Sequence, residues 1–306
     1  MSIYIRLKMH ESPLFSKLKA EGKTSKNPIK ESLMHKGNLK MVLLSLFGAT
    51  MGQGVVWYTG QFYAQTFLET ACKVDFEQTR TILIWAIIFA TPLFIFFGNL
   101  SDKIGRKWII MAGLFLAVIS YRPIYTKMLA VASTKDVVMD DSKTKIERLI
   151  RPDDAKGHSI QTTTTIHFYQ NGITEKLVHN DTLYANGLEK PQAVDKLSKE
   201  LPDDGYWTMV ALIFVQIVFV TMVYGPIAAF LVEIFPTKIR YTSMSLPYHL
   251  GNGVFGGMTP FIAVLLGTLY AGDVLVGLWY PIAIAVVCLV IGTIYLSNKI
   301  DPEVND

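Results

Sequence analysis

The chain has 306 residues, of which 51% are hydrophobic and 18% are charged, and its formal net charge at pH 7 is +4. So apolar a composition excludes an ordinary soluble domain and is typical of a protein that crosses a membrane several times. The positive charge does not indicate a nucleic-acid partner, because the basic residues are concentrated in stretches beside apolar runs.

Residues 1–40 are polar and basic, with nine lysines and arginines against three glutamates. By the positive-inside rule, we expect this segment to lie in the cytoplasm, ahead of the first membrane span.

Residues 41–130 contain three apolar runs, over about 41–68, 79–97 and 108–130, each long enough to cross a bilayer as a helix. In the first run, polar and aromatic residues recur at spacings of three or four and therefore share one stripe of a helix: Thr50, Gln53, Trp57, Gln61 and Gln65. Glutamine is costly in hydrocarbon unless it meets a partner or water. The stripe thus either bonds to a neighbouring helix or lines a cavity.

A basic stretch, Gly98-Asn-Leu-Ser-Asp-Lys-Ile-Gly-Arg-Lys107, separates the second run from the third and predicts a tight hairpin between two helices. Gly98 and Gly105 permit a sharp turn, and Asp102 can pair with Arg106. The stretch resembles the signature loop of the major facilitator superfamily, G-x-L-S/A-D-R/K-x-G-R-K/R. A basic loop that only faces the lipid surface is the plainer alternative.

Arg122 lies late in the third run, beside a tyrosine and a proline. The side chain either extends to the outer membrane surface or contacts a substrate carboxylate from the outer vestibule.

Residues 131–205 interrupt the apolar pattern with ten basic and thirteen acidic residues, a negative balance that predicts an extracytoplasmic insert. Alternation over 159–170, a turn signal at 171–172 and the run 173–179 predict a β-hairpin. Residues 191–201 predict an amphipathic helix with a proline near its start. We therefore expect a small α+β insert, and the spacing of its histidines does not fit a zinc site.

Residues 206–297 contain three more apolar runs, over about 207–231, 243–270 and 276–296. In the last-but-one run, Tyr248, His249 and Asn252 are neighbours on a helix, and Tyr224 lies late in the run before it. Histidine is the side chain whose ordinary pKa lies closest to neutral pH, so His249 is expected to be either a proton carrier or a neutral, hydrogen-bonded histidine.

The segment Glu233-Ile-Phe-Pro-Thr-Lys-Ile-Arg240 resembles the E-x-F-P-x-x-x-R segment that joins the tenth and eleventh helices in the metabolite:proton symporter branch of the superfamily. Glu233 and Arg240 are expected to pair. Together with Asp102 and Arg106 they are expected to form a charge network that locks one closed state and breaks as a transporter alternates. The other possibility is that these charges only fix topology.

The pattern Arg6-Leu-Lys-x-x-Glu-Ser-Pro-x-Phe15 is similar to the central cytoplasmic loop of the same branch. The resemblance implies an all-α membrane protein with six transmembrane helices, the C-terminal half of a major facilitator fold, plus the α+β insert. It further implies a secondary transporter that moves a small organic acid or zwitterion by proton-coupled alternating access. Both termini, including the tail 298–306, are expected in the cytoplasm of a bacterium whose inner membrane holds the chain.

The resemblance and the polar stripe together give two sets of expected site residues. The substrate-binding set is Gln53, Trp57, Gln61, Tyr224, Tyr248, His249 and Asn252, and the gating set is Asp102, Arg106, Glu233 and Arg240. The expected partners are a small-molecule substrate, protons, membrane lipid, and a missing N-terminal six-helix half or a partner chain. No nucleic acid and no cofactor is expected.

Two other classes of function remain at this point. A membrane receptor or scaffold would use the insert as its binding module. An enzyme would need clustered catalytic groups, and the sequence contains no metal motif, nucleophile elbow or phosphate loop, so we expect no enzymatic activity. Cys72 and Cys288 fall at the end of one span and inside another, so neither a disulfide nor a metal site is expected.

Overall fold

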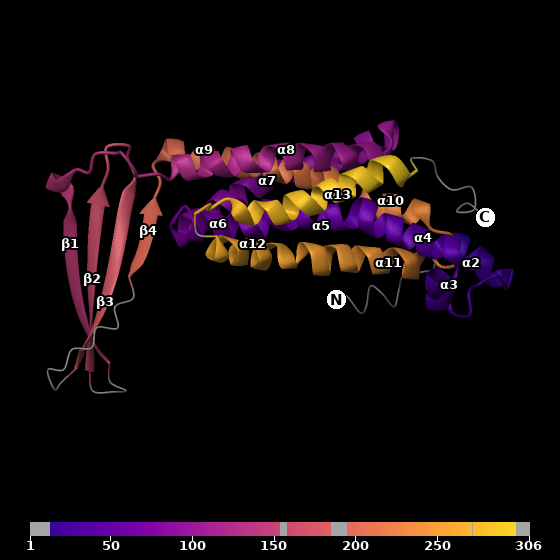
Figure 1. Cartoon of the computed structure of the whole chain (residues 1–306), viewed down its shortest axis with the longest axis horizontal. Helices are drawn as coiled ribbons and strands as arrows, with labels where there is room; N and C mark the ends of the chain where they lie inside the picture. Colours follow the sequence, from indigo (N-terminus) through magenta and orange to yellow (C-terminus); the bar gives the residue numbers. More distant parts are fainter. Residues whose placement is uncertain (1–12, 154–157, 185–194, 271, 298–306) are drawn as a thin grey trace.

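The computed structural model describes residues 13–153, 158–184, 195–270 and 272–297. Long helices run side by side in one bundle, and a four-stranded sheet projects from one end of it (Figure 1). Two short helices, α2 (Pro13–Ala20) and α3 (Pro28–Met34), lie at the opposite end, before the first span.

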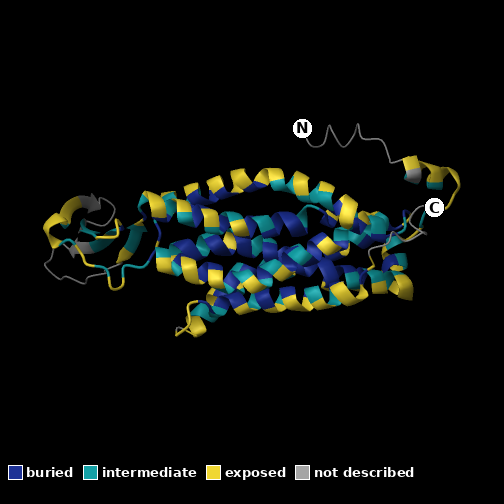
Figure 2. Ribbon diagram, turned by 90° about the horizontal axis from the view of Figure 1, so that it is seen from above, coloured by how far each residue is buried: buried dark blue, intermediate teal, exposed yellow. Residues whose placement is uncertain are grey.

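Six helices are long and apolar enough to cross a membrane: Lys36–Thr70, Phe76–Ile104, Arg106–Val131, Asp203–Ile234, Arg240–Leu269 and Val276–Tyr295. This confirms the six expected spans, and the protein is an integral, multi-pass membrane protein. Buried residues face the middle of the bundle and exposed ones its outside (Figure 2). The second and fifth spans are the least buried, at 22% of their most apolar windows.

Several spans are built from consecutive pieces. The first contains α4 (Lys36–Ser45), a π-helical turn (Leu46–Thr50), α5 (Met51–Tyr58), a second π-helical turn (Thr59–Tyr63) and α6 (Ala64–Thr70). The second, third and sixth consist mainly of α7 (Phe76–Ile104), α8 (Arg106–Val131) and α13 (Trp279–Tyr295). The fourth is α9 (Asp203–Tyr224) followed by α10 (Ile227–Ile234), and the fifth is α11 (Arg240–Leu250), a π-helical turn (Gly251–Gly256) and α12 (Met258–Leu269).

The first and fifth spans cross in backbone contact. A Cβ atom on Gly251 would lie 2.6 Å from the carbonyl carbon of Thr50, and one on Gly54 would overlap the backbone of Gly251. At the same crossing the Thr50 hydroxyl donates to the Pro247 carbonyl at 2.8 Å. Glycine is therefore required here, because only its lack of a side chain lets the two backbones approach so closely.

The π-helical turn at 59–63 is completed by the third span. The hydroxyl of Tyr125, which is fully buried, donates to the Thr59 carbonyl at 3.0 Å, and its ring stacks on Tyr63 at 5.5 Å between centroids. A π turn leaves a carbonyl without its usual helical partner, and in a membrane interior that oxygen needs a donor from the protein.

The signature stretch is not the loop that the sequence predicts. Helix α7 continues through Gly98 and Asp102 to Ile104, and α8 starts at Arg106, so Gly105 alone makes the turn. Its φ is +100° and its ψ is 128°, a backbone conformation open almost only to glycine. Gly98, in contrast, is an ordinary helical residue with open space where a Cβ would be.

The insert is a single antiparallel sheet of order β1-β2-β3-β4, formed by β1 (Lys145–Asp153), β2 (His158–Phe168), β3 (Thr174–Tyr184) and β4 (Lys196–Glu200). The expected hairpin is confirmed as β2 and β3, with Gly172 in the turn at φ +81°. The prediction of a helix over 191–201 is wrong for residues 196–200, which form β4 and pair with β3. Residues 191–194 lie outside the described residues. The alternation of polar and apolar residues in β4 covers only five residues, and the sequence does not indicate which strand pairs with it.

Strand β4 fastens the sheet to the bundle. The amide of Asp75, the N-cap of α7, donates to the Lys199 carbonyl at 2.8 Å, and the Lys199 amide donates to the Lys73 carbonyl at 2.7 Å. The Lys199 ammonium donates to the Ala132 carbonyl, at the end of α8, at 3.2 Å. The sheet is thus held at the start of α7 and the end of α8.

The turn between α7 and α8 gives a test of stability with a matched control. Gly105→Ala should destabilise the folded protein by ~1–3 kcal/mol, because alanine is strained at this φ. Gly98→Ala should leave stability unchanged or raise it, because alanine favours a helix by ~1 kcal/mol over glycine. Unfolding midpoints in detergent would measure both, and equal effects of the two changes would contradict the assignment of the turn to Gly105.

Candidate functional site

Two buried amides join the first and fifth spans in the middle of the bundle. Gln53 on α5 and Asn252 after α11 exchange two hydrogen bonds, each 3.0 Å long, and the Asn252 amide also donates to the Tyr248 carbonyl at 3.0 Å. Gln53 is fully buried and Asn252 is half-buried. The pair satisfies both amides, so Gln53 serves at least as a contact between helices.

Aromatic residues extend this pair toward the fourth span. The hydroxyls of Tyr224 and Tyr248 are 2.8 Å apart, and the ring of Trp57 lies 4.6 Å from that of Tyr224. All three side chains are half-buried. The polar-aromatic cluster, defined as Gln53, Trp57, Tyr224, Tyr248 and Asn252, therefore brings together three spans.

The other two expected substrate-binding residues lie at the margin of the polar-aromatic cluster. His249 is exposed and contacts Tyr248 edge-on, with 5.7 Å between ring centroids. Gln61 is half-buried in the second π turn, one helical turn beyond Trp57.

Three of the four expected gating residues meet at the end of the bundle away from the sheet. Arg106, the first residue of α8, donates to one Asp102 oxygen through Nη2 at 2.8 Å and through Nε at 3.2 Å. Its Nη1 forms an ion pair with Glu233 on α10. One guanidinium at the start of α8 thus ties the last turn of α7 to the end of the fourth span.

Arg240 occupies a different place from the one expected. Among the ion pairs of the described residues Glu233 is paired with Arg106, while Arg240 Nε donates to the Phe235 carbonyl at 3.1 Å. Arg240 therefore holds the carbonyl that follows α10, where a cation is favourable at a helix C-terminus.

Two contacts near the charge network were not found from the sequence. The buried Lys107 ammonium donates to the Thr293 carbonyl at 2.8 Å and the Leu296 carbonyl at 2.7 Å, and so caps α13. Lys107 was expected to face lipid as part of the basic motif, but its ammonium lies inside the protein and caps the C-terminus of α13. A basic residue after a glycine turn gives no sequence signal for this, because its partner lies 186 residues away.

Helix α3 packs on the first turn of α11 and on the connection that precedes it. The buried hydroxyls of Ser32 and Ser243 are 2.7 Å apart, and Lys238 pairs with Glu31 at 2.7 Å. The Lys238 ammonium holds the pKa of the Glu31 carboxyl below its usual value. The basic N-terminal segment is thus docked on the bundle over this stretch.

At the sheet end, Arg122 pairs with Asp273 at 3.5 Å, and its guanidinium lies 5.0 Å from the centre of the Trp279 ring. The arginine joins the third span to the connection before the sixth. Its position at this end of the bundle agrees with both readings, an arginine at the membrane surface and a contact in a vestibule.

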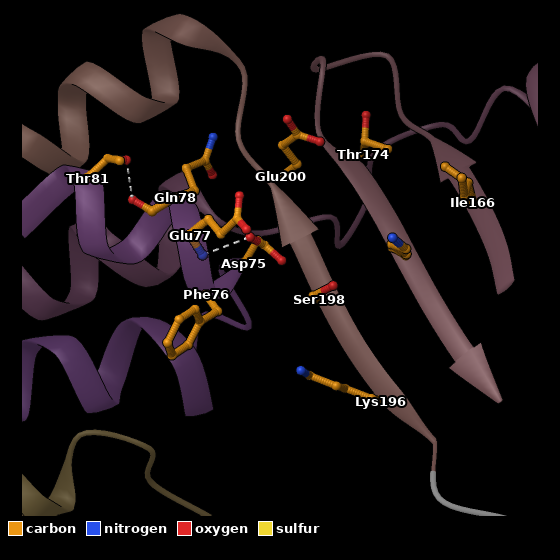
Figure 3. A pocket seen from close by; sticks show the side chains of 11 residues that line it. Asp75, Phe76, Glu77, Gln78, Thr81, Ile166, Thr174, Lys196, Ser198 and Glu200 are labelled. Carbon is orange, nitrogen blue, oxygen red and sulfur yellow. Dashed lines mark hydrogen bonds between the residues drawn. The ribbon is translucent and has the colours of Figure 1, made fainter. Parts of the chain in front are cut away.

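A cavity of about 730 Å³ opens between the sheet and the start of α7 (Figure 3). Asp75 caps α7 by accepting from the Glu77 amide at 2.9 Å, and the Gln78 side chain exchanges two hydrogen bonds with the backbone of Leu201. Lys196 and Glu200 of β4 line the opposite side. The cavity is solvent-facing and of mixed charge, and sequence analysis did not find it because β4 was expected to be a helix.

Metal ligands do not gather anywhere in the described part of the chain, where no group of three or more histidine, cysteine, aspartate or glutamate side chains could hold an ion. Cys72 and Cys288 are both free and buried. Burial raises the pKa of the Cys72 thiol to about 12, so this thiol is not a nucleophile at neutral pH.

Comparison with known proteins agrees with the transporter resemblance. The chain is 22% identical over 300 residues to a Staphylococcus aureus protein that bears the name proline/betaine transporter. The aligned residues cover 97% of this chain and 47% of that protein. The chain is 23% identical over 274 residues to the inner membrane metabolite transport protein YhjE of Escherichia coli, covering 88% of this chain and 45% of that protein. The chain is therefore similar to transporters over almost its whole length.

The chain spans about half the length of the curated relatives it matches. A Haemophilus influenzae protein named as a metabolite transport protein shows the same proportion, with 22% identity over 92% of this chain and 49% of that protein. No family model and no solved structure matches the chain.

The buried amide pair predicts a measurable coupling. Gln53→Leu should destabilise the protein by ~1–3 kcal/mol, because it leaves the side-chain oxygen of Asn252 without the donor that Gln53 supplies. The double change Gln53→Leu and Asn252→Leu should cost less than the sum of the single changes. Unfolding of the four proteins in detergent gives the cycle, and strictly additive losses would show that the amides do not depend on each other.

The Glu31–Lys238 pair predicts a dependence on pH. A carboxyl whose pKa is lowered by folding stabilises the folded state above its unfolded pKa, and the contribution is lost as the pH falls through the lower, folded pKa. At neutral pH the free energy of unfolding of wild type should therefore exceed that of Glu31→Gln by less than ~1 kcal/mol, which is measured as a higher thermal midpoint. The difference should vanish in acid below both pKa values, and a difference that persists there would contradict the ion pair as its cause.

Proposed function

We propose that the chain is the C-terminal six-helix half of a major facilitator secondary transporter that moves a small organic acid or zwitterion by proton-coupled alternating access. Support comes from the six spans, from the signature stretch at the α7–α8 turn, and from relatives of twice the length that are named as transporters. The name of the Staphylococcus aureus relative makes proline and betaine the first solutes to test.

The observation that carries the proposal is the charge network of Asp102, Arg106 and Glu233. It joins the second, third and fourth spans at one end of the bundle, where a rocking movement of helices would separate them. The Asp102 side chain is 59% exposed and the Glu233 side chain 32%, so each contact is weak by itself. Weak contacts suit a gate, because a lock that must open in each cycle stabilises one state only slightly.

The polar-aromatic cluster is the proposed wall of the substrate cavity. Its residues come from the first, fourth and fifth spans, and the fifth is also one of the two least buried spans. A second six-helix half would cover such a face and enclose the half-buried aromatic rings between the halves. The amides and hydroxyls would then bind the polar groups of the solute, while Trp57 and Tyr224 contact its apolar or cationic part.

The proposed topology follows from charge. The basic segment 1–40, the charge network and the tail 298–306 would lie in the cytoplasm, and the insert 131–205 outside. Residues 41–130 and 206–297 would be the two three-helix units of the half. The membrane would be a bacterial inner membrane.

The proposal is tested by supplying the other half. The sequence encoded immediately upstream should contain six more apolar spans, and coexpression of both halves in an uptake-deficient bacterium should restore accumulation of labelled proline or betaine. Absence of uptake by the joined halves for both solutes, and for a panel of organic acids, would count against a transporter.

Within the reunited transporter, Asp102→Asn should slow transport by up to about fivefold while solute binding changes by less than about twofold, because ~1 kcal/mol, the upper value for an exposed ion pair, is a factor of about five in rate. Lys103→Gln is the matched control, because Lys103 is an exposed neighbour of Asp102. Uptake rates and equilibrium binding to membranes measure the two quantities. Equal losses of transport and binding would contradict a gating role.

A further inference from the structure

A groove of about 500 Å³ runs between α4 and α13, at the end of the bundle away from the sheet (Figure 1). The two spans meet backbone to backbone beside it, since a Cβ atom on Gly48 would lie 3.3 Å from the Cα atom of Gly292. The groove lies next to this crossing, toward the N-terminus of α4 and the C-terminus of α13. Exposed side chains of both helices line it, so it opens on the outside of the bundle.

The wall that the first span contributes changes from cationic to apolar along its length. Lys36, Lys40, Leu43 and Phe47 follow one another at spacings of four, three and four residues, so they share one stripe of the helix. All four side chains are exposed. The two ammonium groups therefore lie at the outer end of the groove, and the leucine and phenylalanine lie deeper along the span.

The wall on α13 is apolar and ends in a tyrosine. Ile291 and Tyr295 are four residues apart and share a face of the helix, and Tyr295 is its last residue. Tyrosine is enriched where the hydrocarbon of a membrane meets the head groups. Leu39 and Leu44 of α4 complete the lining. The groove is thus hydrophobic except at the level where head groups lie.

The two lysines at the outer end are available to a ligand. Among the residues that the structure describes, neither ammonium has a carboxylate partner, and Glu31, the acidic residue that precedes them, pairs with Lys238 at 2.7 Å. Lys36 and Lys40 are one helical turn apart, about 6 Å, so both can donate to the same phosphate. Helix α4 begins at Lys36, and the positive end of its dipole adds to their charge.

We propose that this groove binds an anionic phospholipid of the cytoplasmic leaflet, with its phosphate held by Lys36 and Lys40 and one acyl chain between α4 and α13. The stretch from Lys40 to Phe47 covers about 10 Å of helix, which fits within the ~15 Å depth of one leaflet's hydrocarbon. A cationic end on an apolar groove matches an anionic head group on an acyl chain, whereas a second apolar helix would leave both ammonium groups unpaired. The proposed topology enters only in the choice of leaflet, and lipid binding is independent of the transport function.

Lipid titration followed by native mass spectrometry tests the head-group contact on the full chain in detergent. Wild type should bind one phosphatidylglycerol about tenfold more tightly than phosphatidylcholine with the same acyl chains, because each lysine near an anionic head group contributes about fivefold or less. Lys36→Gln with Lys40→Gln should reduce this preference to less than about twofold. Lys103→Gln is the control, an exposed lysine at the same end of the bundle on α7, and should keep the preference. Equal affinity of wild type for the two lipids, or an equal loss in the control, would overturn the proposal.

Filling the groove tests the acyl-chain contact while both lysines remain. Ile291→Trp places an indole in the groove and should weaken phosphatidylglycerol binding by about threefold or more, since the chain loses its packing against both helices. Leu43→Trp, from the opposite wall, should have the same effect. Val290→Trp is the matched control, because Val290 is exposed on α13 and does not line the groove. Unfolding midpoints confirm that each variant is folded. Wild-type binding by both groove variants would overturn the proposal.

Discussion

A membrane interior offers no water to backbone groups, so each carbonyl or amide that leaves the helical pattern needs a partner from the protein. The bundle meets this need with side chains from neighbouring spans. Tyr125 donates to the carbonyl of Thr59 at a π turn, and Lys107 donates to two carbonyls at the end of α13. These hydrogen bonds permit irregular helices, and they fix which spans are neighbours.

The irregular turns lie where the proposed cavity is built. The polar-aromatic cluster follows or adjoins the π turns of the first and fifth spans, and the glycine contacts at Gly54 and Gly251 bring the two spans close enough for the Gln53–Asn252 pair. A π turn also shifts the face that the following residues present. Local irregularity, close packing and the position of polar side chains thus have a common cause.

The ends of the bundle differ in how firmly they are held. Away from the sheet, one partly exposed network centred on Arg106 joins three spans, and helix α3 docks through Ser32 and Glu31. At the other end, backbone hydrogen bonds and the Lys199 side chain fasten the sheet to α7 and α8. The ion pairs at the first end are individually weak, whereas backbone hydrogen bonds hold the second end.

Apolar runs of at least 19 residues determine six spans without reference to any partner, and the Asn171-Gly172 signal determines the hairpin, because these features depend on neighbours along the chain. The sequence also identified Asp102, Arg106 and Glu233 as candidate gating residues. It did not identify which of them pair, since Glu233 could equally pair with Arg240. Tertiary structure decided that pairing, the strand at 196–200 and the role of Lys107. Each depends on groups far apart in the sequence, and local pattern carries no information about such a partner.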